Sequence, residues 1–97
     1  MDREVILREG GELSVEGAVT IDTVVEMVAR GAALFNHENQ VVDLGGVTEV
    51  DSSAISMLLE WQREAKRHGR QMRFTNTPPK LQSLVRLYGV AELVNMT

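Results

Sequence analysis

The order of apolar repeats along the chain restricts the fold more than any other feature of the sequence. Residues 4–8 place Val5 and Leu7 on one face with Ile6 between them, and residues 12–16 alternate apolar and polar side chains. Two such runs on either side of Gly10-Gly11 predict a β-hairpin with a tight turn. Apolar side chains in residues 23–35 then recur at helical spacing, which predicts a helix with one apolar stripe. The chain therefore changes from a strand period to a helix period within its first third.

The same change of period occurs twice more. Residues 40–44 (QVVDL) are a short apolar run typical of a strand buried on both faces, and a loop beginning at Gly45-Gly46 follows them. Glycine and proline mark where the later elements begin and end. These elements are a helix from Ser52 or Ser53 to about Arg67, a strand over residues 71–75, and a helix that opens at Thr77-Pro78-Pro79 and ends at Gly89.

The predicted element order is β-β-α-β-α-β-α, which requires at least one parallel βαβ crossover. We therefore expect an α/β domain with a mixed sheet of four to five strands packed by about three helices. The length of 97 residues suits one domain over residues 1–97 with one modest core. Gly31 weakens the first helix by up to about 1 kcal/mol relative to alanine, so we expect that helix to fray late.

Composition excludes several classes of function. The net charge is −4, and no basic stripe is present to neutralise phosphates, so nucleic acid is not an expected partner. No apolar run approaches the roughly 20 residues of a membrane span, and the first residues lack the apolar core of a secretory signal. The chain has no cysteine, which excludes disulfides and thiolate metal sites. We expect a cytoplasmic protein that does not insert into the membrane directly.

The sequence does not predict an enzyme. His37 and His68 are not spaced for a shared metal site, and the serines have no base that can be assigned to them. Gly45-Gly46 is too short for a phosphate-cradling loop, and the lysine that such a loop needs is absent. We therefore expect no catalytic residue, no metal and no cofactor.

The most informative segment is VVDLGGVTEVDSSA, residues 41–54, in which a strand leads through a loop to Asp51-Ser52-Ser53 at a helix start. A helix N-terminus favours anions, so the helix dipole tolerates a phosphoserine there, although the phosphate would crowd Asp51. The simpler interpretation is that Asp-Ser-Ser is an ordinary helix cap, and on local chemistry alone that interpretation is favoured.

The helix that follows is apolar over a wider arc than one face on a sheet needs. Met57 and Trp61 lie one turn apart at the edge of this arc, and tryptophan is enriched at binding hot spots. We consider them partner anchors, with the alternative that Trp61 only covers the core beside Met57. Leu87 lies off the apolar stripe of the last helix and is expected to be exposed.

The stretch VVDLGGVTEVDSSAISMLLEWQREAKRHGRQMRF and the ending PPKLQSLVRLYGVAELV resemble STAS domains, named for sulphate transporters and anti-sigma factor antagonists. The resemblance is strong from Val41 onward and weak before it. It implies a STAS-like α/β fold and a non-enzymatic regulatory role exerted through partner proteins. Two features depart from the antagonist pattern, since Ala54 replaces the motif glycine and Thr20 replaces an acid near the acceptor serine.

Two branches of the family suggest two partners. EGAVTIDTV and LVRLYGVAELV are similar to the small STAS subunit of the bacterial Mla-type phospholipid-transport ABC system, which implies an ATPase partner and a location at the inner membrane through that complex. In this branch Ser52 matches a contact hydroxyl. The alternative is an anti-sigma factor antagonist phosphorylated by an anti-sigma factor serine kinase, where Ser53 matches the usual acceptor and Ser52 its neighbour. The expected partner-binding residues are Asp51, Ser52, Ser53, Ser56, Met57, Glu60 and Trp61.

Overall fold

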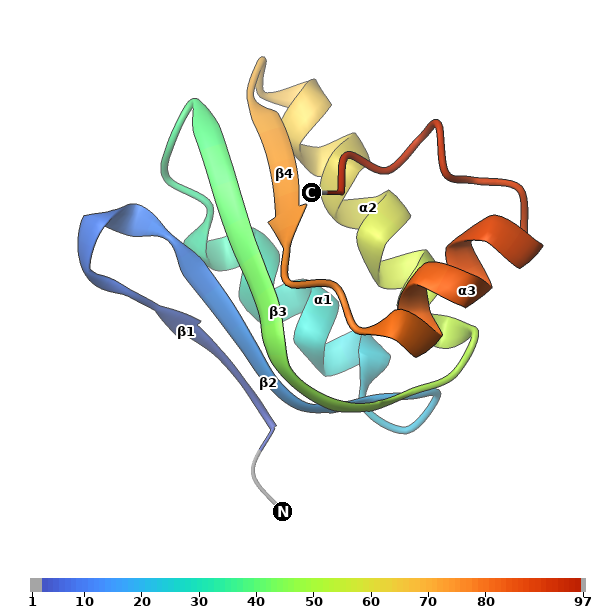
Figure 1. Cartoon of the computed structure of the whole chain (residues 1–97). Coiled ribbons are helices and arrows are strands. Elements are labelled where there is room, and N and C mark those ends of the chain that lie inside the picture. Colours follow the sequence, from blue (N-terminus) through green and yellow to red (C-terminus); the bar gives the residue numbers. More distant parts are fainter. Residues whose placement is uncertain (1–2, 97) are drawn as a thin grey trace.

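The computed structural model describes residues 3–96. Its elements follow the predicted order, and a one-turn 3-10 helix lies within the hairpin connection (Figure 1). The elements are β1 (Glu4–Leu7), the 3-10 helix (Glu9–Gly11), β2 (Leu13–Val19), α1 (Val24–Leu34), β3 (Asn39–Val50), α2 (Ser53–Arg67), β4 (Gln71–Thr75) and α3 (Pro79–Leu87).

The sheet has four strands in the order β1-β2-β3-β4. β1 pairs with β2 in antiparallel register, whereas β2 pairs with β3 and β3 with β4 in parallel. Within residues 3–96, a single bridge between Phe74 and Met96 is all that extends the sheet beyond β4. The sheet is therefore mixed, as the element order predicts, and it has the lower of the two expected strand numbers.

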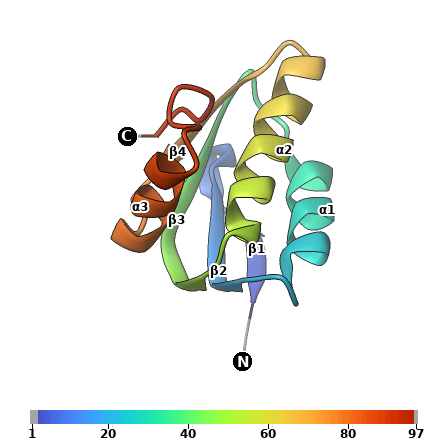
Figure 2. The same ribbon diagram turned by 90° about the vertical axis from the view of Figure 1, so that its right-hand side faces the viewer.

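One face of the sheet is covered by α1 and α2, which lie side by side, while α3 flanks the β4 side and packs against α2 (Figures 1 and 2). The prediction that residues 40–44 are buried on both faces is therefore wrong. Val42 and Leu44 point toward the helices and are fully buried, but Val41 and Asp43 lie on the opposite face and are only half-buried. Burial in β3 alternates because only one of its faces carries helices.

β3 is also longer than the sequence suggests, because it continues through Gly45-Gly46 to Val50. Gly46 pairs with Glu16 of β2 in this stretch. A Cβ atom at Gly46 would lie 2.9 Å from Cγ of Glu16 and 3.0 Å from the carbonyl oxygen of Val15, so the close approach of the strands requires glycine there. The glycines that read as a loop are thus part of the strand.

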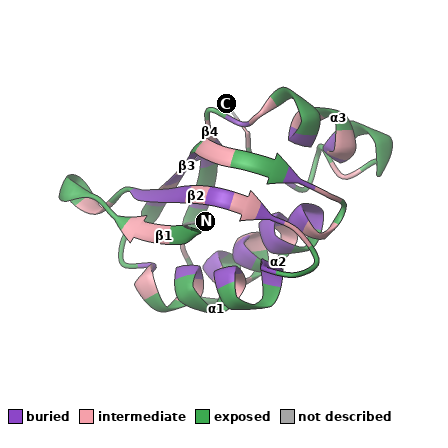
Figure 3. Ribbon diagram, turned by 90° about the horizontal axis from the view of Figure 1, so that it is seen from below, coloured by how far each residue is buried: buried purple, intermediate pink, exposed green. Residues whose placement is uncertain are grey.

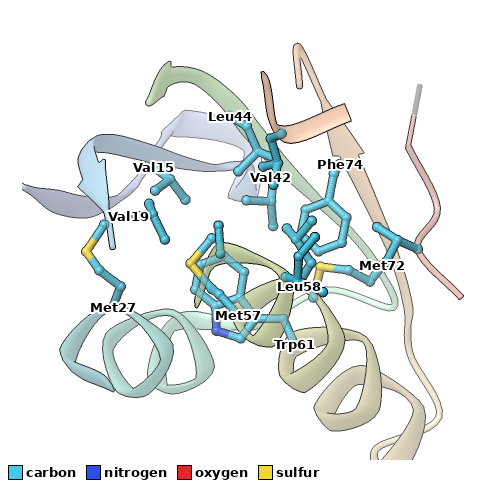
Figure 4. Packing of buried hydrophobic residues seen from close by; sticks show 14 of the residues in the cluster. Val15, Val19, Met27, Val42, Leu44, Met57, Leu58, Trp61, Met72 and Phe74 are labelled. Carbon is cyan, nitrogen blue, oxygen red and sulfur yellow. The ribbon is translucent and has the colours of Figure 1, made fainter. Parts of the chain in front are cut away.

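The core lies between the sheet and the pair α1 and α2, and the buried residues of both helices face the sheet (Figures 3 and 4). Trp61 is fully buried at its centre, where its ring meets Phe35 edge-on at 5.7 Å and stacks with Phe74 at 6.5 Å. Met57 is fully buried as well. The prediction that Met57 and Trp61 are partner anchors is therefore wrong, and the alternative, that Trp61 covers the core beside Met57, describes the structure, since α2 packs against both the sheet and α1.

Gly31 explains how the indole fits between the helices. A Cβ atom at Gly31 would lie 2.2 Å from Cζ2 of Trp61, so the missing side chain makes room for the ring. The indole N–H donates to the carbonyl oxygen of Val28 at 3.0 Å. α1 continues regularly to Leu34, three residues beyond Gly31. The expected late fraying at this glycine is not observed, because the glycine is a packing position.

Candidate functional site

The helix N-termini meet at one end of the sheet. β2, β3 and β4 are parallel, and α1, α2 and α3 follow them in turn, so all three helices begin beside the carboxyl ends of these strands (Figures 1 and 2). The Asp51-Ser52-Ser53 motif connects β3 to α2 at this end. The topology thus places the motif beside the segments that open α1 and α3.

Both carboxylate oxygens of Asp51 accept backbone hydrogen bonds that connect the segments at this end of the sheet. Oδ1 accepts the backbone N–H of Ser53 at 2.8 Å, and Oδ2 accepts the backbone N–H of Ile21 at 3.0 Å. The first bond satisfies a donor at the start of α2, as an N-capping side chain does. The second joins α2 to the loop that precedes α1. The cap is therefore the carboxylate of Asp51, while the side chain of Ser52 makes no capping bond.

The same bonds set the charge of Asp51. Desolvation acts to raise the pKa of Asp51, but hydrogen bonds from the backbone of Ile21, from the backbone and hydroxyl of Ser53, and the charge of Lys80 outweigh it. The net effect is a pKa below the ordinary value. Asp51 is therefore ionised at neutral pH, and a hydrogen-bonded carboxylate of lowered pKa is a weak base.

The two serines differ in their surroundings. Ser52 is exposed, with helical backbone angles at the first position before α2. Ser53 is half-buried, and its hydroxyl lies close enough to the carboxylate of Asp51 to help lower the pKa of that group. A substituent added to Ser52 would project into solvent, whereas one added to Ser53 would meet a carboxylate.

The other predicted partner-binding residues divide into two groups. Ser56 and Glu60 are exposed one turn apart on α2, and Glu60 forms an ion pair with Arg63. Met57 and Trp61 lie in the core and do not contribute to this surface. Of the predicted set, the structure thus places Asp51, Ser52, Ser53, Ser56 and Glu60 at or near the surface of one helix.

Sequence reasoning missed two exposed apolar residues beside the motif. Ile21 is 72% exposed and Val25 is 80% exposed. Val25 lies off the apolar stripe of α1, and this displacement was the available signal. Ile21 follows the strand in a polar segment, where nothing in the sequence reveals its bond to Asp51.

Metal-ligand clusters and membrane-spanning helices are absent from residues 3–96. This part of the chain has no group of three or more histidine, cysteine, aspartate or glutamate side chains placed to hold a metal. None of its helices is long and apolar enough to cross a membrane. A groove of about 560 Å³ lies on the β4 side of α2, where Arg63, Lys66 and Arg70 line it together with amide and apolar side chains.

Comparisons with known proteins agree on the fold. The family model described as "Mlab, STAS domain" matches residues 4–95. The anti-sigma factor antagonist SpoIIAA in its unphosphorylated form superposes with a TM-score of 0.73 at 12% identity, covering 99% of this chain and 88% of that one. The Bacillus cell fate determinant SpoIIAA in the phosphorylated form gives a TM-score of 0.66 at 11% identity, with 99% and 91% covered. No curated protein sequence matches the chain.

Proposed function

The chain belongs to the STAS domain family, and on this basis we propose that it is a non-enzymatic regulatory domain that binds a partner protein through the end of the fold where its helices begin. The surface we propose comprises Asp51, Ser52, Ser53, Ser56 and Glu60. The partner we propose is the ATPase of a phospholipid-transport ABC complex, which would hold the domain at the cytoplasmic side of the inner membrane. The description of the matching family model supports this branch of the family.

The bonding of Asp51 is the observation that carries the proposal. Nucleophilic catalysis by a serine needs a base within hydrogen-bond reach. The carboxylate beside Ser52 and Ser53 has a lowered pKa, and its two oxygens already accept the N–H groups of Ser53 and Ile21. It organises the surface and is poorly suited to taking a proton from a hydroxyl. A fixed, exposed and polar end of the fold suits recognition better than catalysis.

A second candidate function is that of an anti-sigma factor antagonist controlled by serine phosphorylation. The fold shared with SpoIIAA, whose structure is known in phosphorylated and unphosphorylated forms, supports this candidate. Ser53 matches the acceptor position of the family motif, but it is half-buried and a phosphate on it would meet the carboxylate of Asp51. Ser52 is the more accessible hydroxyl.

One pair of measurements distinguishes the candidates. The purified domain is titrated by calorimetry into the ATPase of the phospholipid-transport complex from the same organism, and separately into the organism's anti-sigma factor kinases with ATP. We expect binding to the ATPase and no added phosphate in the intact mass of protein purified from its own host. Phosphorylation at Ser53 by a kinase, together with no binding to the ATPase, would establish the antagonist instead.

A further inference from the structure

We infer that Ile21 and Val25 are the apolar anchors of the docking surface, and that they enter an apolar socket on the partner whose rim is basic. The inference rests on the proposed function, because it assigns the residues that supply affinity at the same end of the fold. Ile21 and Val25 take the role predicted for Met57 and Trp61, which are buried in the core. Apolar side chains that lose their water on association contribute affinity, and most of the binding energy of an interface comes from a few well-packed, desolvated residues.

The two side chains form one exposed apolar step. The backbone N–H of Val24 donates to the carbonyl oxygen of Thr20, so residues 20–24 already follow a helical turn before α1 begins. Ile21 and Val25 are four positions apart and therefore lie on the same side of that turn. At 72% and 80% exposed, they leave most of their apolar surface in water. Covering this surface in a complex is favourable.

The step is held rigidly beside the Asp51 motif. The backbone N–H of Ile21 is bound by Oδ2 of Asp51, so the residue that caps α2 also positions the first anchor. α1 is fixed against α2 by the bond from Trp61 to Val28. An anchor that is already ordered loses less conformational entropy on binding than a mobile one. Ser52, Ser53 and the two apolar anchors therefore form one surface that is already ordered before a partner binds.

The charge beside the anchors indicates the rim of the socket. Asp22 is exposed next to Ile21 and makes no ion pair within the described part of the chain. Glu26, one residue beyond Val25, is already balanced by Arg30 at 3.0 Å. An unbalanced carboxylate at the edge of an apolar contact is complemented by a cation on the partner. We therefore expect arginine or lysine on the partner opposite Asp22.

The test uses the full chain and the ATPase of the proposed complex, with affinity measured by calorimetry. We expect Ile21→Ser and Val25→Ser each to weaken binding by at least about tenfold. Val25→Thr keeps the shape of the side chain and should also weaken binding. Leu87→Ser is the matched control, since Leu87 is 77% exposed on α3, and it should change the affinity by less than about twofold. Because these side chains are exposed, melting curves of all four variants should match the wild type.

Asp22→Asn tests the basic rim separately. It should slow association and reduce the dependence of the association rate on salt, while the dissociation rate changes little.

The outcomes separate this inference from the proposed function. If Ser52→Asp abolishes binding while Ile21→Ser and Val25→Ser bind like the wild type, the docking surface stands and the anchors are refuted. If Leu87→Ser weakens binding as much as Val25→Ser, the anchors are likewise refuted. If the wild-type chain does not bind the ATPase, the proposed function fails and the inference fails with it.

Discussion

The carboxylate of Asp51 accepts the backbone N–H of Ile21, 30 residues earlier in the chain, at 3.0 Å. Its other oxygen caps α2 through the N–H of Ser53. One side chain therefore determines where α2 starts and where the loop before α1 lies. Because Ser53 and Ile21 are both bonded to the carboxylate of Asp51, the stability of this end of the fold and its ability to bind a partner should be coupled.

Asp51→Ala should lower the free energy of unfolding by about 1–2 kcal/mol, because it removes a helix cap and leaves the N–H of Ile21 without its acceptor. Asp51→Asn keeps one oxygen acceptor and should cost less. The measurement is urea unfolding at pH 7. A cost for Asp51→Ala within error of zero would show that water replaces the carboxylate without loss.

The lowered pKa of Asp51 predicts a pH dependence of stability. A carboxylate whose pKa is lower in the folded protein stabilises it above the unfolded pKa of about 3.9, and this contribution is lost as the pH falls through the folded value. The unfolding free energy of Asp51→Asn should therefore fall less than that of the wild type between pH 5 and the lowest accessible pH. Parallel pH profiles would contradict the assignment.

The two serines should respond differently to substitution. Ser53→Ala removes a half-buried hydroxyl that favours the ionised form of Asp51 and should cost up to about 1 kcal/mol, whereas Ser52→Ala, which removes no capping bond, should be close to neutral. Ser53→Asp places a second carboxylate against Asp51 and should destabilise the fold more than Ser52→Asp. Thermal unfolding of the four variants tests this order, and equal effects at the two positions would contradict it.

Trp61→Ala should lower the free energy of unfolding by about 3–5 kcal/mol, because it leaves a cavity between α1 and α2 and removes the indole N–H that bonds the carbonyl of Val28. The affinity for the partner, measured where the variant is still folded, should be unchanged. If Trp61→Ala lost affinity for the partner while the free energy of unfolding stayed unchanged, Trp61 would belong to the docking surface instead of the core.

Gly31→Ala should destabilise the protein even though alanine is the better helix former. The gain in helix propensity is about 1 kcal/mol, while forcing a methyl group against a buried ring costs typically about 1–3 kcal/mol. The added Cβ atom would lie 2.2 Å from Cζ2 of Trp61. In a Trp61→Phe background, where the ring is smaller, the cost of Gly31→Ala should fall. A double-mutant cycle measures this coupling, and simple additivity would contradict the packing account.

The element order was predictable from the sequence because the repeats are local. Strand and helix periods are visible in segments such as residues 71–75, and β4 begins and ends there as predicted. The end of β3 was not predictable, since Gly45-Gly46 resembles a turn until its partner strand is known. Only the pairing with β2 shows that Gly46 must approach Glu16 closely.

The site was predictable only in part. The motif placed Asp51, Ser52 and Ser53 at the start of a helix, which the structure shows. The sequence does not show which of the three side chains caps the helix and which is free for a partner. That depends on the bond between Ile21 and Asp51, which no sequence pattern predicts. The docking surface and the core both stayed open for Trp61, because an apolar arc on a helix does not reveal how many neighbours cover it. α2 is packed against the sheet, α1 and α3, so more of its circumference is buried than one layer requires.

The central claim is that the domain binds its partner through the surface around Ser52. The most direct measurement is the Kd of the wild type and of Ser52→Asp for the ATPase of the proposed complex, with Leu87→Ser as the control. Ser52 is exposed, so the aspartate should leave the melting temperature nearly unchanged. We predict that Ser52→Asp weakens binding by at least about a hundredfold while the control binds like the wild type. Wild-type affinity in a folded Ser52→Asp variant would contradict the account.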